Sequence, residues 1–221
     1  MRLAVSPYEA PSFSHQYGPF GKMFNSFTNP VDDGINGCDA LILWGGRDIH
    51  PSFYGQKPHI RNQINYGEPV SQRDIEEWHL MHEAKKYGIP IIGICRGAQF
   101  LCVFAGGKLI QDVTHHRCGH EIITWDGKTL HAPAEHHQMM NIEGVKEFRM
   151  LGWTEPRSSY YEDEFGKVTR SINVDPEVVY FPRIKGFAIQ PHPEWGPVGT
   201  EFNNWLTQQM ETILFTSSCE V

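Results

Sequence analysis

The sequence predicts an α/β fold of three layers, in which helices cover both faces of a central, mostly parallel sheet. Residues 89–94 form an almost wholly apolar run, which is typical of a strand buried on both faces of a parallel sheet. A helical segment over 95–105 follows directly, ends at Gly106-Gly107 and leads into another strand. This succession of strand, helix, tight turn and strand is the pattern of a βαβ crossover.

The first third of the chain supplies shorter elements. Residues 3–5 and 38–44 are apolar runs that each predict a strand, and Gly45-Gly46 ends the second run. Residues 21–27 carry a weaker helical pattern. Residues 47–70 contain three prolines and two glycines and are expected to form a long loop, and such loops are usually lids or binding loops.

A longer helix is expected over residues 71–87. Ser71 is suited to the N-cap position, and Gly88 with Pro90 beyond it marks the end of the helix. The predicted apolar face consists of Ile75, Trp78, Leu80, Met81 and Ala84.

Short strand-like segments fill much of the second half of the chain. These predicted strands cover residues 108–113, 121–125, 178–181 and 186–190. An amphipathic helix over 202–215 follows them. Since no repeat, low-complexity tract or linker interrupts the pattern, a single domain over 1–221 is expected.

Charge and cysteine content exclude several classes of function. The net charge of −7, from 26 acidic and 19 basic residues, and the lack of a Lys/Arg-rich stretch argue against a nucleic-acid partner. No run of eighteen apolar residues predicts a membrane span, and the first apolar run is too short for a signal peptide. The five cysteines are odd in number and show no paired spacing, which indicates reduced thiols and a cytoplasmic protein. They are Cys38, Cys95, Cys102, Cys118 and Cys219.

A nucleophile is predicted at Cys95, between the buried strand and its helix. Gly93 and Gly97 flank it in a Gly-x-Cys-x-Gly pattern, which permits a sharp turn that lifts one side chain above the sheet. The helix N-terminus there favours thiolate over thiol, and the backbone N–H of Arg96 is placed to bind an oxyanion. The alternative is a buried structural cysteine, which is the commoner fate of this residue.

An acid/base pair is predicted at His192 and Glu194, directly after the strand over 186–190. Side chains at the carboxyl ends of parallel strands meet at one edge of a sheet, so His192 is expected near Cys95. A base beside a thiol, with a carboxylate to orient the base, is the arrangement of a catalytic triad. The order Cys95, His192, Glu194 excludes the α/β-hydrolases, in which the acid precedes the histidine.

Several stretches together resemble the class I glutamine amidotransferase family, and the nearest branch is the γ-glutamyl-γ-aminobutyrate hydrolase-like peptidases. Residues 93–99 (Gly-Ile-Cys-Arg-Gly-Ala-Gln) and 106–112 carry the resemblance most clearly. Residues 45–55, Arg73-Asp74, 136–138 and 190–195 also fit, in the expected order.

The resemblance implies a flavodoxin-like fold and a Cys95, His192 and Glu194 triad. It implies hydrolysis of a γ-glutamyl amide bond, in glutamine or a γ-glutamyl amine, through a thioester, with no cofactor. The other implied site residues are Gly46 and Arg47 with Arg96 at the oxyanion hole, Gln99 at the substrate amide, and His137 and Gln138 at the glutamyl α-groups.

The sequence departs from the branch at two positions and leaves the function open between alternatives. Ala134 stands where a serine is common, and Trp44 precedes the glycine pair, where a smaller residue or proline is usual. Besides a standalone hydrolase acting on a small γ-glutamyl substrate, the chain fits a glutaminase subunit that delivers ammonia to a separate synthase chain. A non-catalytic module and a thiol redox or chaperone protein are weaker alternatives.

A metal site is not expected from the sequence. His115, His116, Cys118 and His120 are close enough in sequence to supply ligands, but their spacing matches no zinc pattern. These residues are assigned instead to a loop after Gln111-Asp112.

Overall fold

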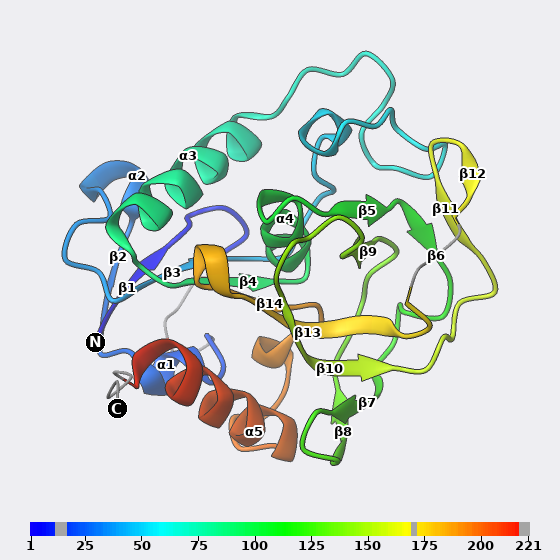
Figure 1. The fold of residues 1–221 in the computed structure, drawn as a ribbon. Coiled ribbons are helices and arrows are strands. Elements are labelled where there is room, and N and C mark those ends of the chain that lie inside the picture. Colours follow the sequence, from blue (N-terminus) through cyan, green and yellow to red (C-terminus); the bar gives the residue numbers. More distant parts are fainter. Residues whose placement is uncertain (12–16, 169–171, 217–221) are drawn as a thin grey trace.

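A nine-stranded sheet runs through the centre of the protein. The computed structural model describes residues 1–11, 17–168 and 172–216. Five strands pair in parallel, in the order β2 (Ser26–Thr28), β1 (Arg2–Val5), β3 (Ala40–Leu43), β4 (Ile91–Ile94) and β14 (Gly186–Ile189) (Figure 1). Because Leu43 pairs with Gly93 and Ile94 with Ile189, β3, β4 and β14 end together at one edge.

Antiparallel strands extend the sheet beyond β14. They follow in the order β13 (Asp175–Phe181), β10 (Arg149–Thr154), β7 (His120–Thr124) and β8 (Thr129–Ala132). Two small antiparallel sheets lie on the same side of the molecule (Figure 1). One joins β6 (Asp112–Val113), β11 (Tyr161–Asp163) and β12 (Gly166–Lys167), and the other joins β5 (Lys108–Ile110) and β9 (Met139–Asn141).

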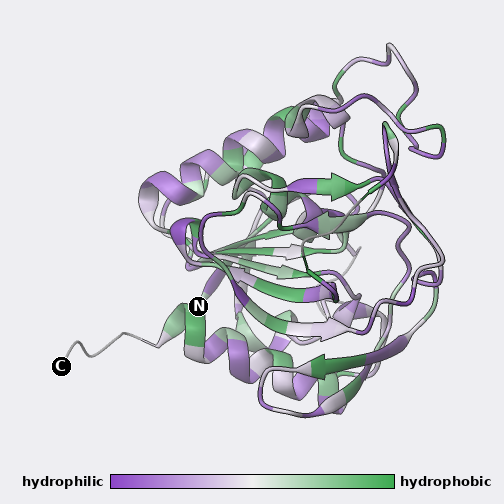
Figure 2. Cartoon of the chain, turned by 45° about the vertical axis from the view of Figure 1, so that its right-hand side comes forward, coloured by the Kyte–Doolittle hydropathy of each residue, from purple (hydrophilic) through white to green (hydrophobic). Residues whose placement is uncertain are grey.

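Helices cover both faces of the sheet, and the side chains of its strands alternate between two apolar cores. α3 (Gln72–Tyr87) and α4 (Arg96–Phe104) pack against Leu41 and Leu43 of β3. α1 (Phe20–Met23) and α5 (Glu201–Met210) pack on the other face, against Ile42 of the same strand (Figure 1). In Figure 2 the central strands are mostly apolar, whereas α3 alternates hydrophilic and hydrophobic residues along its length. The predicted three-layer α/β fold is confirmed.

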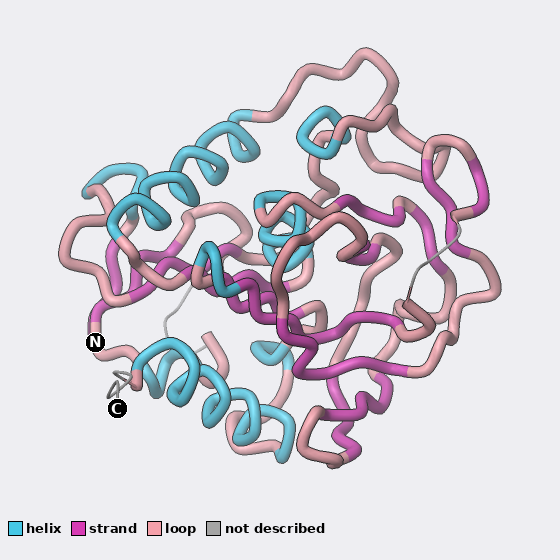
Figure 3. The backbone as a smooth tube through the Cα atoms, viewed as in Figure 1, coloured by secondary structure: helices cyan, strands magenta, loops and turns pink. Residues whose placement is uncertain are grey.

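Short helical elements occupy several of the connections. They are α2 (Pro30–Asp33), the 3₁₀ turns η2 (Pro51–Tyr54), η3 (Pro182–Ile184) and η4 (Pro193–Trp195), and the π-helical turn η5 (Glu211–Phe215). Figure 3 shows the long loop that joins β3 to α3. Within the described residues, η2 is the one regular element in this loop. The predicted loop over 47–70 is therefore confirmed apart from that turn.

The predicted long helix is confirmed in its ends and in most of its apolar face, since Leu80, Met81 and Ala84 are buried in the core. The Ser71 Oγ accepts a hydrogen bond from the Asp74 N–H at 3.1 Å, and Gly88 takes the left-handed conformation at the C-terminus. Ile75, placed by the sequence on the apolar face, is 38% exposed, whereas Asp74 and Glu77 are buried. The reason is the buried guanidinium of Arg96, which pairs with both carboxylates.

Three other predicted elements differ from the structure in their bounds or continuity. The weak helix over 21–27 divides into α1 and β2, and the strand over 108–113 breaks at Gln111 into β5 and β6. The Gln111 side chain leaves the strand pattern and hydrogen-bonds to the loop at Gln56 and Lys57. The helix over 202–215 is α-helical only to Met210 and ends in the π-helical turn.

The sequence also predicted reduced cysteines and no membrane-spanning helix. Cys38, Cys95, Cys102 and Cys118 are free thiols, and Cys219 lies outside the described residues. Within the described ranges, no helix combines the length and the apolar character needed to cross a bilayer. The single-domain organisation stays a prediction.

Candidate active site

Cys95 lies in a tight turn between β4 and α4. Its backbone has φ of +50°, in a region that residues other than glycine rarely adopt. A Cβ on Gly93 would lie 2.4 Å from the Gly97 carbonyl oxygen, and a Cβ on Gly97 would lie 2.4 Å from that of Leu43. Both flanking glycines are therefore required by close backbone approach, as the sequence pattern predicted. The turn also places Cys95 at the N-cap of α4, beside the free backbone N–H groups of the first helical turn.

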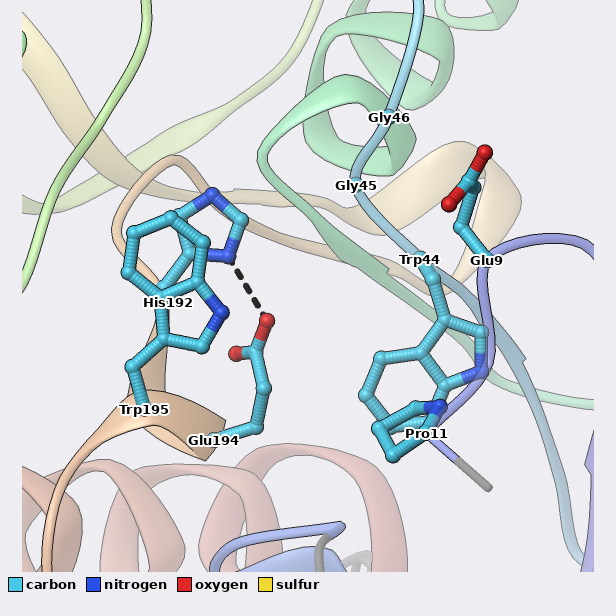
Figure 4. A pocket seen from close by; sticks show the side chains of 8 residues that line it. All are labelled: Glu9, Pro11, Trp44, Gly45, Gly46, His192, Glu194 and Trp195. Atoms are coloured by element: carbon cyan, nitrogen blue, oxygen red, sulfur yellow. Dashed lines mark hydrogen bonds and ion pairs between the residues drawn. The ribbon is translucent and has the colours of Figure 1, made fainter.

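His192 and Glu194 lie in the loop that follows β14. The His192 Nδ1 is 2.6 Å from the Glu194 Oε1, and Figure 4 shows the two side chains turned toward each other. The His192 backbone N–H donates to the Pro133 carbonyl at 2.7 Å, which fixes its loop against the loop that follows β8. The indole of Trp195 stacks on the imidazole with 3.7 Å between ring centroids. These contacts hold the ring in one orientation.

Cys95 and His192 meet at the edge where β4 and β14 end. A Cβ placed on Gly45 would lie 3.5 Å from the Cys95 Cβ and 2.9 Å from the His192 Cε1, so both side chains crowd the same glycine. Burial alone would lower the pKa of His192, but its hydrogen bonds to Cys95 and Glu194 and their negative charges raise it to about 10. These surroundings therefore favour the protonated, imidazolium form of His192.

The Gly45-Gly46 turn after β3 closes over this pair. Gly46 has φ of +125°, and a Cβ there would lie 2.5 Å from the Arg73 Nη1. The Arg73 Nη2 donates hydrogen bonds to the carbonyls of Trp44 at 3.0 Å and Gly45 at 2.8 Å. Arg73 is therefore a positioning residue for the turn, a role that its pairing with Asp74 in the sequence motif did not reveal.

Two arginines were predicted to offer backbone N–H groups to an oxyanion. As the first residue of α4, Arg96 has an N–H that no carbonyl within the helix can accept, and it directly follows Cys95. The side chain of Arg96 is buried against Asp74 and Glu77, which the sequence analysis missed. The side chain of Arg47 points away to Glu68, at 2.7 Å, and is half exposed.

The three predicted substrate-binding side chains are all buried. The Gln99 Nε2 donates to the Gln138 carbonyl at 3.0 Å. His137 lies between two carboxylates, with its Nε2 3.0 Å from the Asp48 Oδ1 and its Nδ1 3.4 Å from the Asp112 Oδ1. Burial opposes a raised pKa for His137, but the hydrogen bonds and charges of these carboxylates raise it above its usual value.

A cavity of about 490 Å³ opens beside His192 and Glu194. The residues that line it are Glu9, Pro11, Trp44, Gly45, Gly46, His192, Glu194 and Trp195 (Figure 4). The predicted Gln99, His137 and Gln138 do not line this cavity. The sequence analysis assigned no role to Glu9 or Trp195, and it noted Trp44 only as a departure from the family pattern.

The chain is similar in sequence to proteins of one known family. The Peptidase C26 family model matches residues 24–157, a range that includes Cys95 and ends before His192 and Glu194. Rv2859c of Mycobacterium tuberculosis, named provisionally as a glutamine amidotransferase, is 33% identical over 140 residues, which cover 52% of this chain and 44% of the relative. Protein NtpR of Enterococcus hirae is 45% identical over 80 residues, which cover 36% of this chain and 32% of the relative. The chain thus spans less than half the length of these two relatives.

Solved structures share the fold over nearly the whole chain. A Thermoplasma acidophilum protein, named provisionally as a subunit of GMP synthase, has a TM-score of 0.59 at 16% identity and covers 97% of this chain and 94% of its own. A glutamine amidotransferase of Thermotoga maritima also has a TM-score of 0.59, at 14% identity, covering 96% of this chain and 81% of its own. With the family match over more than half its length, the chain belongs to the Peptidase C26 family of class I glutamine amidotransferase-like proteins.

Proposed function

We propose that the protein hydrolyses a γ-glutamyl amide bond, in glutamine or a γ-glutamyl amine, with Cys95 as nucleophile. The observation that carries the proposal is the placement of His192 between Cys95 and Glu194. Membership of the family supports amide hydrolysis in general. The γ-glutamyl specificity rests on the sequence motifs.

The first half of the reaction forms a thioester. The Cys95 thiolate attacks the γ-carbonyl carbon, and the carbonyl oxygen takes the negative charge. The His192 imidazolium then gives its proton to the departing nitrogen, so that ammonia or an amine leaves and a γ-glutamyl thioester remains. Glu194 keeps the imidazole oriented and stabilises its charged form.

The second half of the reaction hydrolyses the thioester. Neutral His192 takes a proton from water, the hydroxide adds to the thioester carbonyl, and glutamate leaves as the Cys95 thiolate is restored. In both halves the oxyanion needs donors. The Arg96 N–H and the turn at Gly46 and Arg47 are the proposed donors, and each is typically worth about 3–4 kcal/mol of barrier.

The cavity beside His192 and Glu194 offers room for a leaving group larger than ammonia. It is bounded by the indoles of Trp44 and Trp195 and by the carboxylate of Glu9. An amine with an apolar chain would place that chain on the indoles. We therefore expect the enzyme to accept γ-glutamyl amines as well as glutamine.

The test is product release by the purified chain. Ammonia from glutamine, and glutamate from a panel of γ-glutamyl amines, would be measured beside the variant Cys95→Ala. Cys118→Ala is the matched control, because Cys118 is an exposed free thiol outside the site. We expect turnover to vanish in Cys95→Ala and to persist in Cys118→Ala. Undiminished turnover in Cys95→Ala would refute the proposed nucleophile.

A glutaminase subunit that delivers ammonia to a separate synthase chain is the second candidate. One similar structure carries the name of a GMP synthase subunit, and at 16% identity this likeness supports the fold. A folded protein that hydrolyses none of the panel alone would favour this candidate over the standalone hydrolase.

A further inference from the structure

Three buried side chains converge behind the candidate active site, on the antiparallel side of the sheet. His116 precedes β7, His136 lies between β8 and β9, and Glu177 is on β13. Their exposed fractions are 0%, 4% and 0%. One ligand-type atom from each lies within 4.8 Å of the others, and the two imidazole centroids are 4.8 Å apart. Segments that are distant in the sequence thus bring three metal-ligating groups together in the interior.

Hydrogen bonds on the far side of each ring fix its tautomer. The His116 Nε2 is 3.0 Å from the Asp175 Oδ2, and a carboxylate only accepts, so this nitrogen carries the proton. The His136 Nδ1 is 2.8 Å from the Gln138 carbonyl oxygen and carries the proton for the same reason. In the neutral rings, the His116 Nδ1 and the His136 Nε2 therefore present lone pairs. Metal-binding histidines are held in this way by an outer carboxylate or carbonyl.

While both rings are neutral, the atoms left over are all acceptors; a proton on the His116 Nδ1 would instead point toward the Glu177 Oε1 at 3.5 Å. The His116 Nδ1, the His136 Nε2 and the Glu177 Oε2 are buried and have no hydrogen-bond partner among the described residues. The Glu177 Oε1 accepts from the His120 Nε2 at 3.0 Å and lies 3.5 Å from the His116 Nδ1, which leaves Oε2 unused. Unpaired acceptors that face one another in the interior are unfavourable unless a proton or a metal ion lies between them.

We propose that His116, His136 and Glu177 bind a divalent first-row transition-metal ion, with zinc the best fit. Two imidazoles and one carboxylate are ligands that zinc prefers, and a fourth position is open to water. Ligand atoms around tetrahedral zinc lie about 3.4 Å apart, so a small rotation of the rings would close the present spacing. A soft-metal site would need thiolate, and hard cations such as magnesium prefer oxygen ligands throughout.

The proposed site departs from the sequence-based expectation that the chain holds no metal. Of the four residues considered there, only His116 is a proposed ligand, and His120 supports Glu177 from outside. His115 and Cys118 are exposed and do not join the cluster. The decisive partners, His136 and Glu177, come from distant segments and could not be assembled from spacing in the sequence.

The position of the ion indicates a structural role. Its ligands would tie the loop before β7 and the loop after β8 to β13. The loop after β8 also holds the Pro133 carbonyl that accepts from the His192 N–H, and the Glu135 carbonyl near the Cys95 Sγ. The ion would therefore brace the backbone that supports the triad and take no part in bond cleavage.

Direct metal binding by the full chain tests the proposal. The variant Cys95→Ala is used, so that the active-site thiol cannot bind the probe. After chelator treatment, the protein is titrated with Co²⁺, whose visible absorption reports a four-coordinate site, and Zn²⁺ is then added in competition. We expect one equivalent of Co²⁺ per chain and loss of the absorption as Zn²⁺ displaces it.

Ligand variants and matched controls locate the ion. Glu177→Gln and His136→Gln are each expected to weaken Zn²⁺ binding by more than about 100-fold, since even outer-shell changes cost about 10–100-fold. Glu162→Gln is the control at a second, half-buried group of His59, Asp112 and Glu162, and His131→Gln is the control for an exposed histidine. Both controls should bind as before.

Two results would overturn the proposal. One is the absence of stoichiometric Co²⁺ or Zn²⁺ binding by Cys95→Ala protein that circular dichroism shows to be folded. The other is unchanged binding in folded Glu177→Gln protein. If either ligand variant fails to fold, the titration of Cys95→Ala still decides the question, and its readout does not depend on hydrolytic activity.

Discussion

Removal of the Arg96 guanidinium is expected to destabilise the protein more than the loss of an ordinary ion pair. The side chain is 2% exposed and pairs with Asp74 and Glu77 of α3, which are 1% and 0% exposed. In the variant Arg96→Met, these carboxylates stay in the interior without their shared cation. Breaking a buried pair in this way costs about 3–5 kcal/mol, because the remaining charge is uncompensated.

The two carboxylates would not be affected equally. Glu77 keeps Arg73, whose Nε is 3.2 Å from its Oε1, and the Ser6 hydroxyl, which donates to the same oxygen at 2.7 Å. Asp74 keeps the longer 3.3 Å hydrogen bond from the His50 N–H. The unpaired charge is therefore mainly that of Asp74. Adding Asp74→Asn to Arg96→Met should recover about 1–2 kcal/mol of the loss.

Urea unfolding followed by tryptophan fluorescence measures both effects. For a slope of about 3 kcal/mol per molar urea, the midpoint should fall by about 1–2 M in Arg96→Met. Arg183→Met is the matched control, because its pair with Glu147 spans 3.6 Å with side chains 63% and 57% exposed, and it should change stability by less than about 0.5 kcal/mol. A loss below about 1 kcal/mol in Arg96→Met, or no recovery in the double variant, would refute the reasoning.

Three further predictions concern the triad. In the hydrolysis assay, Gly45→Ala should lower kcat/KM by about 10²-fold, because the added methyl would lie 2.9 Å from the His192 Cε1. Gly196→Ala is the control and should have little effect, because its added methyl would lie 3.9 Å from the nearest atom. Glu194→Gln should lower kcat by about 10²–10⁴-fold and shift the pH–rate profile to lower pH. The reason is that the substitution removes one of the charges that raise the pKa of His192 to about 10. An unshifted profile would contradict the assigned role of Glu194. Since the pKa of His192 is raised from 6.5 in the folded state, its stabilisation is fully present below pH 6.5 and is lost as the pH rises toward 10. The difference in unfolding free energy between wild type and His192→Gln should therefore shrink from pH 6 to pH 10 in urea titrations, and a difference independent of pH would exclude this linkage.

The sequence predicted the parts of the fold that depend on local pattern. The apolar run at β4 and the cap residues Ser71 and Gly88 are local signals, and the structure confirms the elements they predicted. β2, β8, β9, β10, β11 and β12 were not predicted, because all but β10 have four residues or fewer and each is held in place by its pairing with other strands. Their existence depends on partners that a single-sequence pattern does not contain.

The candidate site was predictable to a similar extent. Cys95 is marked by its flanking glycines and His192 by its place after the last strand, and parallel register brings the two strand ends together. The cavity residues Glu9 and Trp195 carry no comparable signal, because their position beside His192 depends on how two loops fold over the sheet edge. Reactive side chains at the ends of strands can be predicted from the sequence, whereas the residues that line the cavity beside them cannot.

The acidic residues of α3 show why the helix pattern alone misplaced Ile75 and missed two buried carboxylates. The turn at Cys95 requires Gly97 to lie against Leu43, which fixes the start of α4 and directs the Arg96 side chain toward α3. A buried guanidinium needs carboxylates, so Asp74 and Glu77 turn inward and Ile75 turns outward.

The same ionic cluster reaches the other side of the site. Arg73, paired with Glu77, donates to the Trp44 and Gly45 carbonyls, so one group of charges joins the start of α4 to the turn after β3. If the proposed mechanism is correct, these two segments carry the nucleophile and the oxyanion donors. The cluster would then set their spacing, which explains why polar groups are buried where an apolar interface would stabilise the fold equally well.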